Sequence, residues 1–110
     1  MTAAWTIEYH TPKVESFALG LPDDLLAGYL QVSEMMVQFG ANLGMPHTRA
    51  LGRGLFELRV GGKEGIARVF FCTLMGQRIV MLHGFIKKTQ QIPHFELERA
   101  YKFLAEAKLK

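Results

Sequence analysis

Three apolar segments separated by very short linkers constrain the fold of this chain more than any other feature. The segments are 54–60, 65–73 and 78–85. The linkers 61–64 and 74–77 are too short for a crossover helix, and both contain glycine, which tight turns favour. The three segments are therefore predicted to form an antiparallel meander.

The residues on either side of this meander predict one further strand and three helices. Alternating apolar and polar residues at 5–9 are typical of a half-buried strand. Proline and acidic residues predict helix starts near residue 12, near residue 22 with an end at Gly40, and over 93–108. The predicted order is βααβββα, an α+β fold in which a mainly antiparallel four-stranded sheet has its helices on one face.

Length and composition predict one domain over residues 1–110. Of the 110 residues, 49% are hydrophobic, which is enough for one compact core but leaves little for a second domain. The single cysteine, Cys72, excludes an intramolecular disulfide and fits a reducing cytoplasm. No secretory leader follows Met1, and no apolar run approaches the roughly 18 residues of a spanning helix. We therefore expect a cytoplasmic protein without a membrane partner.

Positive charge is concentrated in the second half of the chain. Residues 49–90 contain eight basic and two acidic residues, a net charge of +6, whereas the whole chain carries +3. A polyanion site and a solvated basic face both fit this distribution. The basic residues of this stretch are Arg49, Arg53, Arg59, Lys63, Arg68, Arg78, Lys87 and Lys88.

Strand alternation places one arginine among apolar neighbours. Arg68 should share a face with Phe70 and Cys72, and in the preceding strand Glu57 and Arg59 should point away from the apolar side. A guanidinium in the middle of a strand is costly to desolvate without a partner. Arg68 is therefore expected either to pair with a carboxylate such as Glu57 or to bind an anionic ligand.

Other chemical signals are weaker. Lys87 and Lys88 could protect a sheet edge or approach a phosphate, and His83 lies in an apolar strand where a histidine is more often packed than catalytic. The remaining histidines have no metal-ligand spacing, and there is no nucleotide-binding fingerprint or nucleophile elbow. We expect no metal and no cofactor.

Three blocks of sequence together resemble a known family. They are Leu51–Arg59 (LGRGLFELR), Ile66–Phe71 (IARVFF) and Met81–Pro93 (MLHGFIKKTQQIP). In this order they are similar to the phage-derived branch of the RelE/HigB toxins, which belong to the RelE/ParE superfamily of type II toxin–antitoxin systems. The resemblance covers the chain from about Trp5 to the last helix. It implies an α+β domain with a basic surface that enters the ribosomal decoding site.

The resemblance also implies an activity, an endoribonuclease that cuts messenger RNA on the ribosome without a metal. In this chemistry the RNA 2′-hydroxyl attacks the adjacent phosphodiester and leaves a cyclic phosphate. Negative charge develops on the nonbridging oxygens, and an arginine fork matches that geometry better than a lysine. The catalytic candidates are Arg68 first, then Arg59, Lys87 and Lys88; the RNA-binding candidates are Arg49, Arg53, Lys63 and Arg78; Glu57 and His83 are further possibilities.

The resemblance leaves partners and alternatives to be tested. It implies a cognate antitoxin, commonly a helix-turn-helix repressor, that covers the basic face. Well-known relatives place a Tyr or His near the C-terminus in the catalytic cluster, whereas Tyr101 lies on the predicted core stripe of the last helix. A non-catalytic RNA- or ribosome-binding protein, a ParE-like inhibitor of DNA gyrase and an inactive remnant would all keep the same fold.

Overall fold

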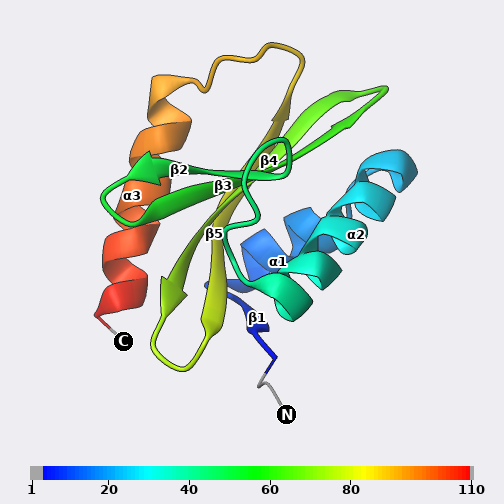
Figure 1. Cartoon of the computed structure of the whole chain (residues 1–110). Coiled ribbons are helices and arrows are strands. Elements are labelled where there is room, and N and C mark those ends of the chain that lie inside the picture. The colour runs from blue at the N-terminus through cyan, green and yellow to red at the C-terminus, as the bar shows by residue number, and fades with distance from the viewer. Residues whose placement is uncertain (1–3, 110) are drawn as a thin grey trace.

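The computed structural model describes residues 4–109 and has an α+β architecture in which a five-stranded sheet lies between helices (Figure 1). The order of elements differs from the predicted one by one additional strand. The elements are β1 (Thr6–Tyr9), α1 (Pro12–Leu19), α2 (Asp23–Phe39), β2 (Thr48–Gly52), β3 (Leu55–Gly62), β4 (Gly65–Leu74), β5 (Arg78–Lys87) and α3 (His94–Lys108).

The sheet has the strand order β1-β5-β4-β3-β2 and is mixed. Strands β2 to β5 form an antiparallel meander, which confirms the three central strands predicted from the linkers. β1 pairs parallel with β5, and the two helices and strands β2 to β4 lie between them along the chain.

The prediction of four strands was wrong because it missed β2. This strand follows the cis Met45–Pro46 bond and pairs only with β3, so it is an edge strand without a fully apolar face. Its connection to β3 is the tight turn at Arg53 and Gly54, where both residues have positive φ.

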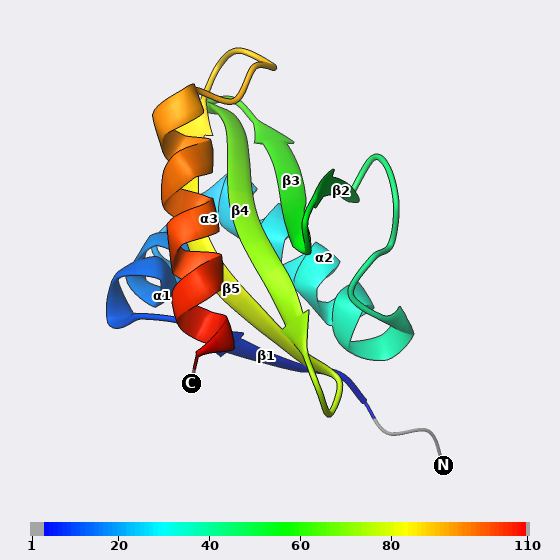
Figure 2. The same ribbon diagram turned by 90° about the vertical axis from the view of Figure 1, so that its left-hand side faces the viewer.

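The prediction that all helices pack on one face was also wrong. α1 and α2 cover one face of the sheet, and α3 covers the other (Figure 2). The reason lies in the central strands, which are apolar on both faces; six consecutive residues of β4, 67–72, are buried. On the α1/α2 face the core includes Leu58, Val69 and Met81, and on the α3 face it includes Leu55, Phe70 and Leu82. One layer of helices could not bury both faces.

The helix ends agree with the sequence prediction. Thr11 caps α1, because its Oγ1 accepts a hydrogen bond from the Val14 amide at 3.3 Å. Gly40, with φ 111°, ends α2 and donates its amide to the Met36 carbonyl. Within residues 4–109, no helix has the length and apolar character required to cross a membrane.

Candidate functional site

Three arginines surround one glutamate on the α3 face of the sheet. Arg49 on β2 lies opposite Glu57 on β3, and Arg59 on β3 lies opposite Arg68 on β4. Glu57 Oε1 is 2.9 Å from Arg49 Nε and 3.4 Å from Arg59 Nε, and its Oε2 is 3.4 Å from Arg68 Nε. The expected Arg68–Glu57 pair is therefore confirmed, as part of a larger group. We call these four residues the arginine cluster.

The arginine cluster extends from the protein interior to solvent. The side chains of Arg68 and Glu57 are fully buried, that of Arg59 is 17% exposed, and that of Arg49 is 42% exposed. With every arginine protonated and Glu57 ionised, the cluster carries two positive charges more than its carboxylate neutralises. An anion could approach it from the Arg49 and Arg59 side.

One buried donor of the arginine cluster lacks a partner among the described residues. Arg59 Nε, Arg68 Nε and Arg68 Nη1 are buried and make no hydrogen bond within residues 4–109, but both Nε atoms lie 3.4 Å from Glu57. Buried polar groups are ordinarily hydrogen-bonded, so the unpartnered Arg68 Nη1 indicates capacity for a ligand.

The loop that joins β5 to α3 (Figure 1) contacts the arginine cluster. The backbone carbonyls of Thr89 and Gln90 accept hydrogen bonds from Arg68 Nη2, and Gln90 Oε1 accepts one from Arg59 Nη2. These loop oxygens accept hydrogen bonds from guanidinium groups that could instead donate to the oxygens of a phosphate. Gln90 was not among the predicted site residues, although it lies inside the Met81–Pro93 block that carries the resemblance.

Electrostatics makes the arginine cluster a source of positive charge. Desolvation lowers the pKa of Arg68 below its usual value, Glu57 opposes this shift, and Arg59 and Arg49 add to it. A guanidinium nevertheless stays protonated in neutral water. Arg68 can therefore stabilise an anion but is unsuited to accept a proton, and Glu57 is committed to three arginines.

Lys87 lies on the same face as Arg68, near the end of β5. Arg68 pairs with Phe85, and Lys87 follows two residues later, opposite Ile66. Because side chains alternate along a strand, Phe85 and Lys87 point to the same side. Lys87 and Lys88 are both exposed and lead into the loop that contacts the arginine cluster.

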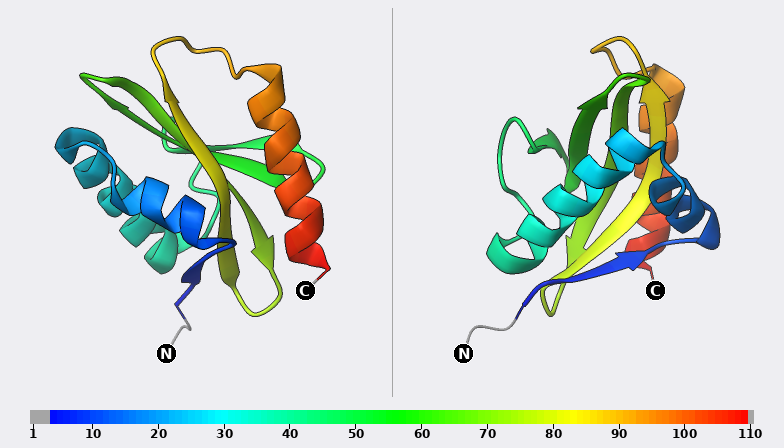
Figure 3. Two further views of the ribbon diagram at one scale, coloured as in Figure 1. Left: turned by 180° about the vertical axis from the view of Figure 1, so that it is seen from behind. Right: turned by 90° about the vertical axis from the view of Figure 1, so that its right-hand side faces the viewer.

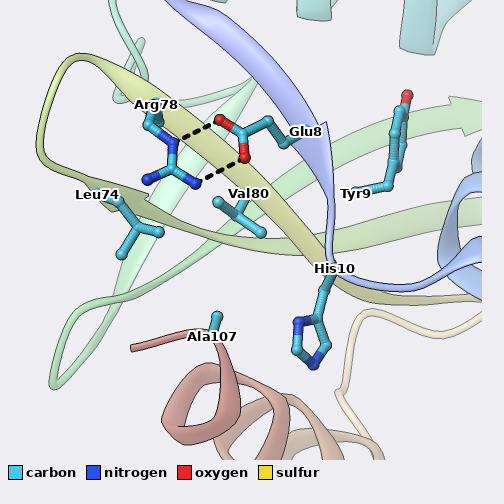
Figure 4. Close-up of a pocket in the computed structure, with 7 residues that line it drawn as sticks. All are labelled: Glu8, Tyr9, His10, Leu74, Arg78, Val80 and Ala107. Carbon is cyan, nitrogen blue, oxygen red and sulfur yellow. Dashed lines mark hydrogen bonds and ion pairs between the residues drawn. The ribbon is translucent and has the colours of Figure 1, made fainter. Parts of the chain in front are cut away.

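The remaining RNA-binding candidates do not join the arginine cluster. The Arg53 guanidinium stacks over the Tyr101 ring at 4.2 Å, and Lys63 lies in the β3–β4 turn. Arg78 lies at the opposite end of β5 from Phe85 and makes two hydrogen bonds to Glu8, of 2.6 and 2.8 Å (Figure 4). Arg78 is thus already neutralised by a carboxylate.

His83 lies on the α3 face beyond Phe70. The pairing of β4 with β5 shifts at this point, from Phe71–Met81 to Phe70–His83. His83 stacks on Phe70, and its Nε2 is 2.8 Å from Glu96 Oε1. In the sheet register Phe70 separates His83 from Glu57, so His83 is not part of the arginine cluster.

Comparison with known proteins identifies the family. A family model described as Phage derived protein Gp49-like (DUF891) matches residues 17–105, which is most of the chain. The chain belongs to this Gp49-like family. The span shared with the Gp49-like family contains the whole arginine cluster and the loop that contacts it. No curated protein matches the chain. Within residues 4–109, no group of three or more His, Cys, Asp or Glu is placed to hold a metal ion.

Proposed function

We propose that this Gp49-like protein is the toxin of a type II toxin–antitoxin system and cuts messenger RNA on the ribosome in the cytoplasm. The family assignment to phage-derived proteins and the resemblance to RelE/HigB toxins support this proposal. The structural observation that carries it is the arginine cluster, in which three guanidinium groups share one carboxylate and the buried Arg68 Nη1 has no partner among the described residues.

In the proposed reaction the RNA supplies its own nucleophile. The 2′-oxygen forms a bond to the adjacent phosphorus while the bond from phosphorus to the 5′-oxygen breaks, leaving a 2′,3′-cyclic phosphate and a 5′-hydroxyl. The 2′-hydroxyl loses a proton and the 5′-oxygen gains one. This chemistry requires no metal.

The arginine cluster would act on the charge that develops at phosphorus. Arg59, which is partly exposed, would contact a nonbridging oxygen, and buried Arg68 would donate a second hydrogen bond once the loop at Gln90 moves away from it. Glu57 holds the guanidinium groups in place. Lys87 and Lys88 would add charge and are the candidates to protonate the 5′-oxygen.

The proposal is tested with translating ribosomes and an end-labelled message in EDTA. We expect the native protein to give discrete RNA fragments and Arg68→Ala to give none. Lys108→Gln is the matched control, because Lys108 is a cation at the far end of α3. Circular dichroism establishes that each variant is folded. Equal cleavage by the native protein and Arg68→Ala would contradict the assignment.

A non-catalytic RNA- or ribosome-binding protein is the second candidate, and one observation favours it. Glu57 and His83, the two further candidates from the sequence, are both engaged, Glu57 by three arginines and His83 by Glu96. A binder would bind ribosomes in a salt-dependent manner and leave the message intact. A gyrase inhibitor would instead produce DNA breaks with an intact message.

A cognate antitoxin that covers the arginine cluster remains part of the proposal. The carboxylates of an acidic segment could accept the hydrogen bonds that Arg59 and Arg68 now donate to Gln90. Co-expression with helix-turn-helix proteins encoded beside the gene of this chain tests this. Recovery of a complex that no longer cuts message is the expected result, and separate elution of the two proteins is the contrary one.

A further inference from the structure

One edge of the sheet is only half covered. β1 pairs with β5 from Arg78 to Met81, and at His10 the chain then turns towards α1. β5 continues to Lys87, so residues 82–87 have no strand neighbour on this side within the described part of the chain (Figure 3). Unpaired backbone groups at a strand edge are a template for another extended chain.

A cavity of about 500 Å³ lies beside this open edge, between α1 and α3. Its apolar lining includes Phe17 from α1, Leu82 from β5 and Phe103 from α3. Phe17 packs directly against the backbone of β5, since a Cβ added at Gly84 would lie 2.4 Å from its ring. We call this cavity the β5-edge groove.

The rim of the β5-edge groove is basic. Lys13 of α1 and Arg99 and Lys102 of α3 line it, and all three are exposed. None of them takes part in an ion pair within residues 4–109. The carboxylate that lines the groove, Glu96, is engaged by His83. The groove therefore presents positive charge around an apolar floor.

We propose that the β5-edge groove binds an extended acidic segment of a partner protein, which adds a strand along residues 82–87. Main-chain hydrogen bonds to β5 would give affinity, and alternate side chains would give specificity. Apolar side chains of the segment would contact Phe17 and Phe103, and its carboxylates would meet Lys13 and Lys102. The six residues of open edge match the usual length of a strand.

This proposal goes beyond RNA cleavage and rests on different observations, although Lys87 at the end of the open edge also belongs to the nuclease proposal. The arginine cluster belongs to β2, β3 and β4, whereas the β5-edge groove belongs to β5 and the two flanking helices. A nucleic acid could also meet a basic rim, but it cannot extend a sheet through backbone hydrogen bonds. Strand addition therefore distinguishes the two classes of partner.

The test uses the full chain and a displayed library of random peptides. We expect selection to enrich peptides in which acidic and apolar residues alternate. The double variant Lys13→Glu/Lys102→Glu should bind a synthetic copy of the enriched peptide about tenfold or more weakly than the native chain does. Lys108→Glu, the matched control on α3, should bind it as tightly as the native chain. Amide hydrogen exchange should show protection of residues 82–87 when the peptide is bound.

Three results would overturn the proposal: no enrichment of acidic peptides, equal affinity of the peptide for the native chain and the double variant, or no added protection of residues 82–87 when the peptide is bound. Protection of these residues by a single-stranded RNA oligonucleotide but not by the peptide would assign the groove to nucleic acid instead. Cleavage of message by the double variant, measured alongside, separates failure of this proposal from failure of the nuclease assignment.

Discussion

Arg59 and Arg68 lie directly opposite each other on β3 and β4, and their guanidinium groups share the buried carboxylate of Glu57. Like charges directly across a strand pair destabilise a sheet unless a counter-ion offsets them. Glu57 supplies that counter-ion at 3.4 Å from each of the two Nε atoms. The stability of this part of the sheet therefore depends on one carboxylate.

We expect Glu57→Gln to lower the free energy of unfolding by about 3–5 kcal/mol, because it leaves buried Arg68 without a counter-ion. Urea denaturation of the native chain and the variant measures the change. Arg49→Gln is the matched control; Arg49 is 42% exposed, so its loss should cost less than about 1 kcal/mol. Equal losses for the two variants would show that Glu57 is not the organising residue.

Arg59→Gln should lower the rate of RNA cleavage about 100- to 1,000-fold, as expected for removal of one donor to a developing oxyanion. The side chain lies at the solvent side of the cluster, so the fold should survive. Single-turnover cleavage of a labelled message measures the effect. Arg59→Lys keeps the charge and tests the planar fork; full activity in the lysine variant would assign Arg59 a charge role only.

Some features of the arginine cluster followed from the sequence and others did not. Period-two alternation placed Arg68 and Glu57 on one face, because β3 and β4 are joined by a hairpin-length turn. The place of Arg49 beside Glu57 could not be predicted without β2, and the five residues of β2 lack the apolar alternation that would have revealed a strand. The contacts of Gln90 with Arg59 and Arg68 depend on the path of a loop, and loop paths cannot be predicted from sequence periodicity.

The same distinction holds for the fold. Short glycine linkers predicted the meander, and Pro12 and Gly40 marked helix ends, because these are local effects of turn chemistry and helix termini. The face of the sheet on which α3 packs depends on tertiary contacts, and the sequence pattern of α3 alone does not determine it. The buried run 67–72 was the available signal, since a strand buried on both faces needs a layer on each.

The carboxylate of Asp24 links α2 to the β3–β4 turn and should make stability depend on pH. Its Oδ2 accepts a hydrogen bond of 2.8 Å from the Lys63 amide, and this bond lowers the pKa of Asp24 below its usual range. A lowered pKa in the folded state stabilises the protein above the unfolded pKa of about 4, and the effect is lost as pH falls through the folded value.

Asp24→Asn should therefore be less stable than the native chain near neutral pH, and the difference should shrink as pH falls through the folded pKa of Asp24. Thermal unfolding from about pH 7 to about pH 2 measures it. Asp23→Asn, one residue earlier in the same first turn, is the control for helix-dipole effects. A difference that stays constant across this range would contradict the role of the Lys63 bond.

Gly28 allows α2 to lie close to β3. A Cβ added there would lie 2.3 Å from Val60 Cγ1. We expect Gly28→Ala to destabilise the fold by about 1–3 kcal/mol through overpacking, despite the better helix propensity of alanine. The double variant Gly28→Ala/Val60→Ala should be more stable than the sum of its two single changes implies, which urea denaturation of all four proteins determines. Additive changes would show that the close approach is unimportant.

The chemical nature of the cut RNA end is the measurement that decides whether the arginine cluster is a phosphodiester-cleaving site. Message cut by the native chain on ribosomes in EDTA should carry a 2′,3′-cyclic phosphate on the upstream fragment and a 5′-hydroxyl on the downstream one. The Arg59→Gln variant should form both products more slowly than the native chain. An intact message, or fragments with a 3′-hydroxyl and a 5′-phosphate, would contradict attack by the 2′-hydroxyl.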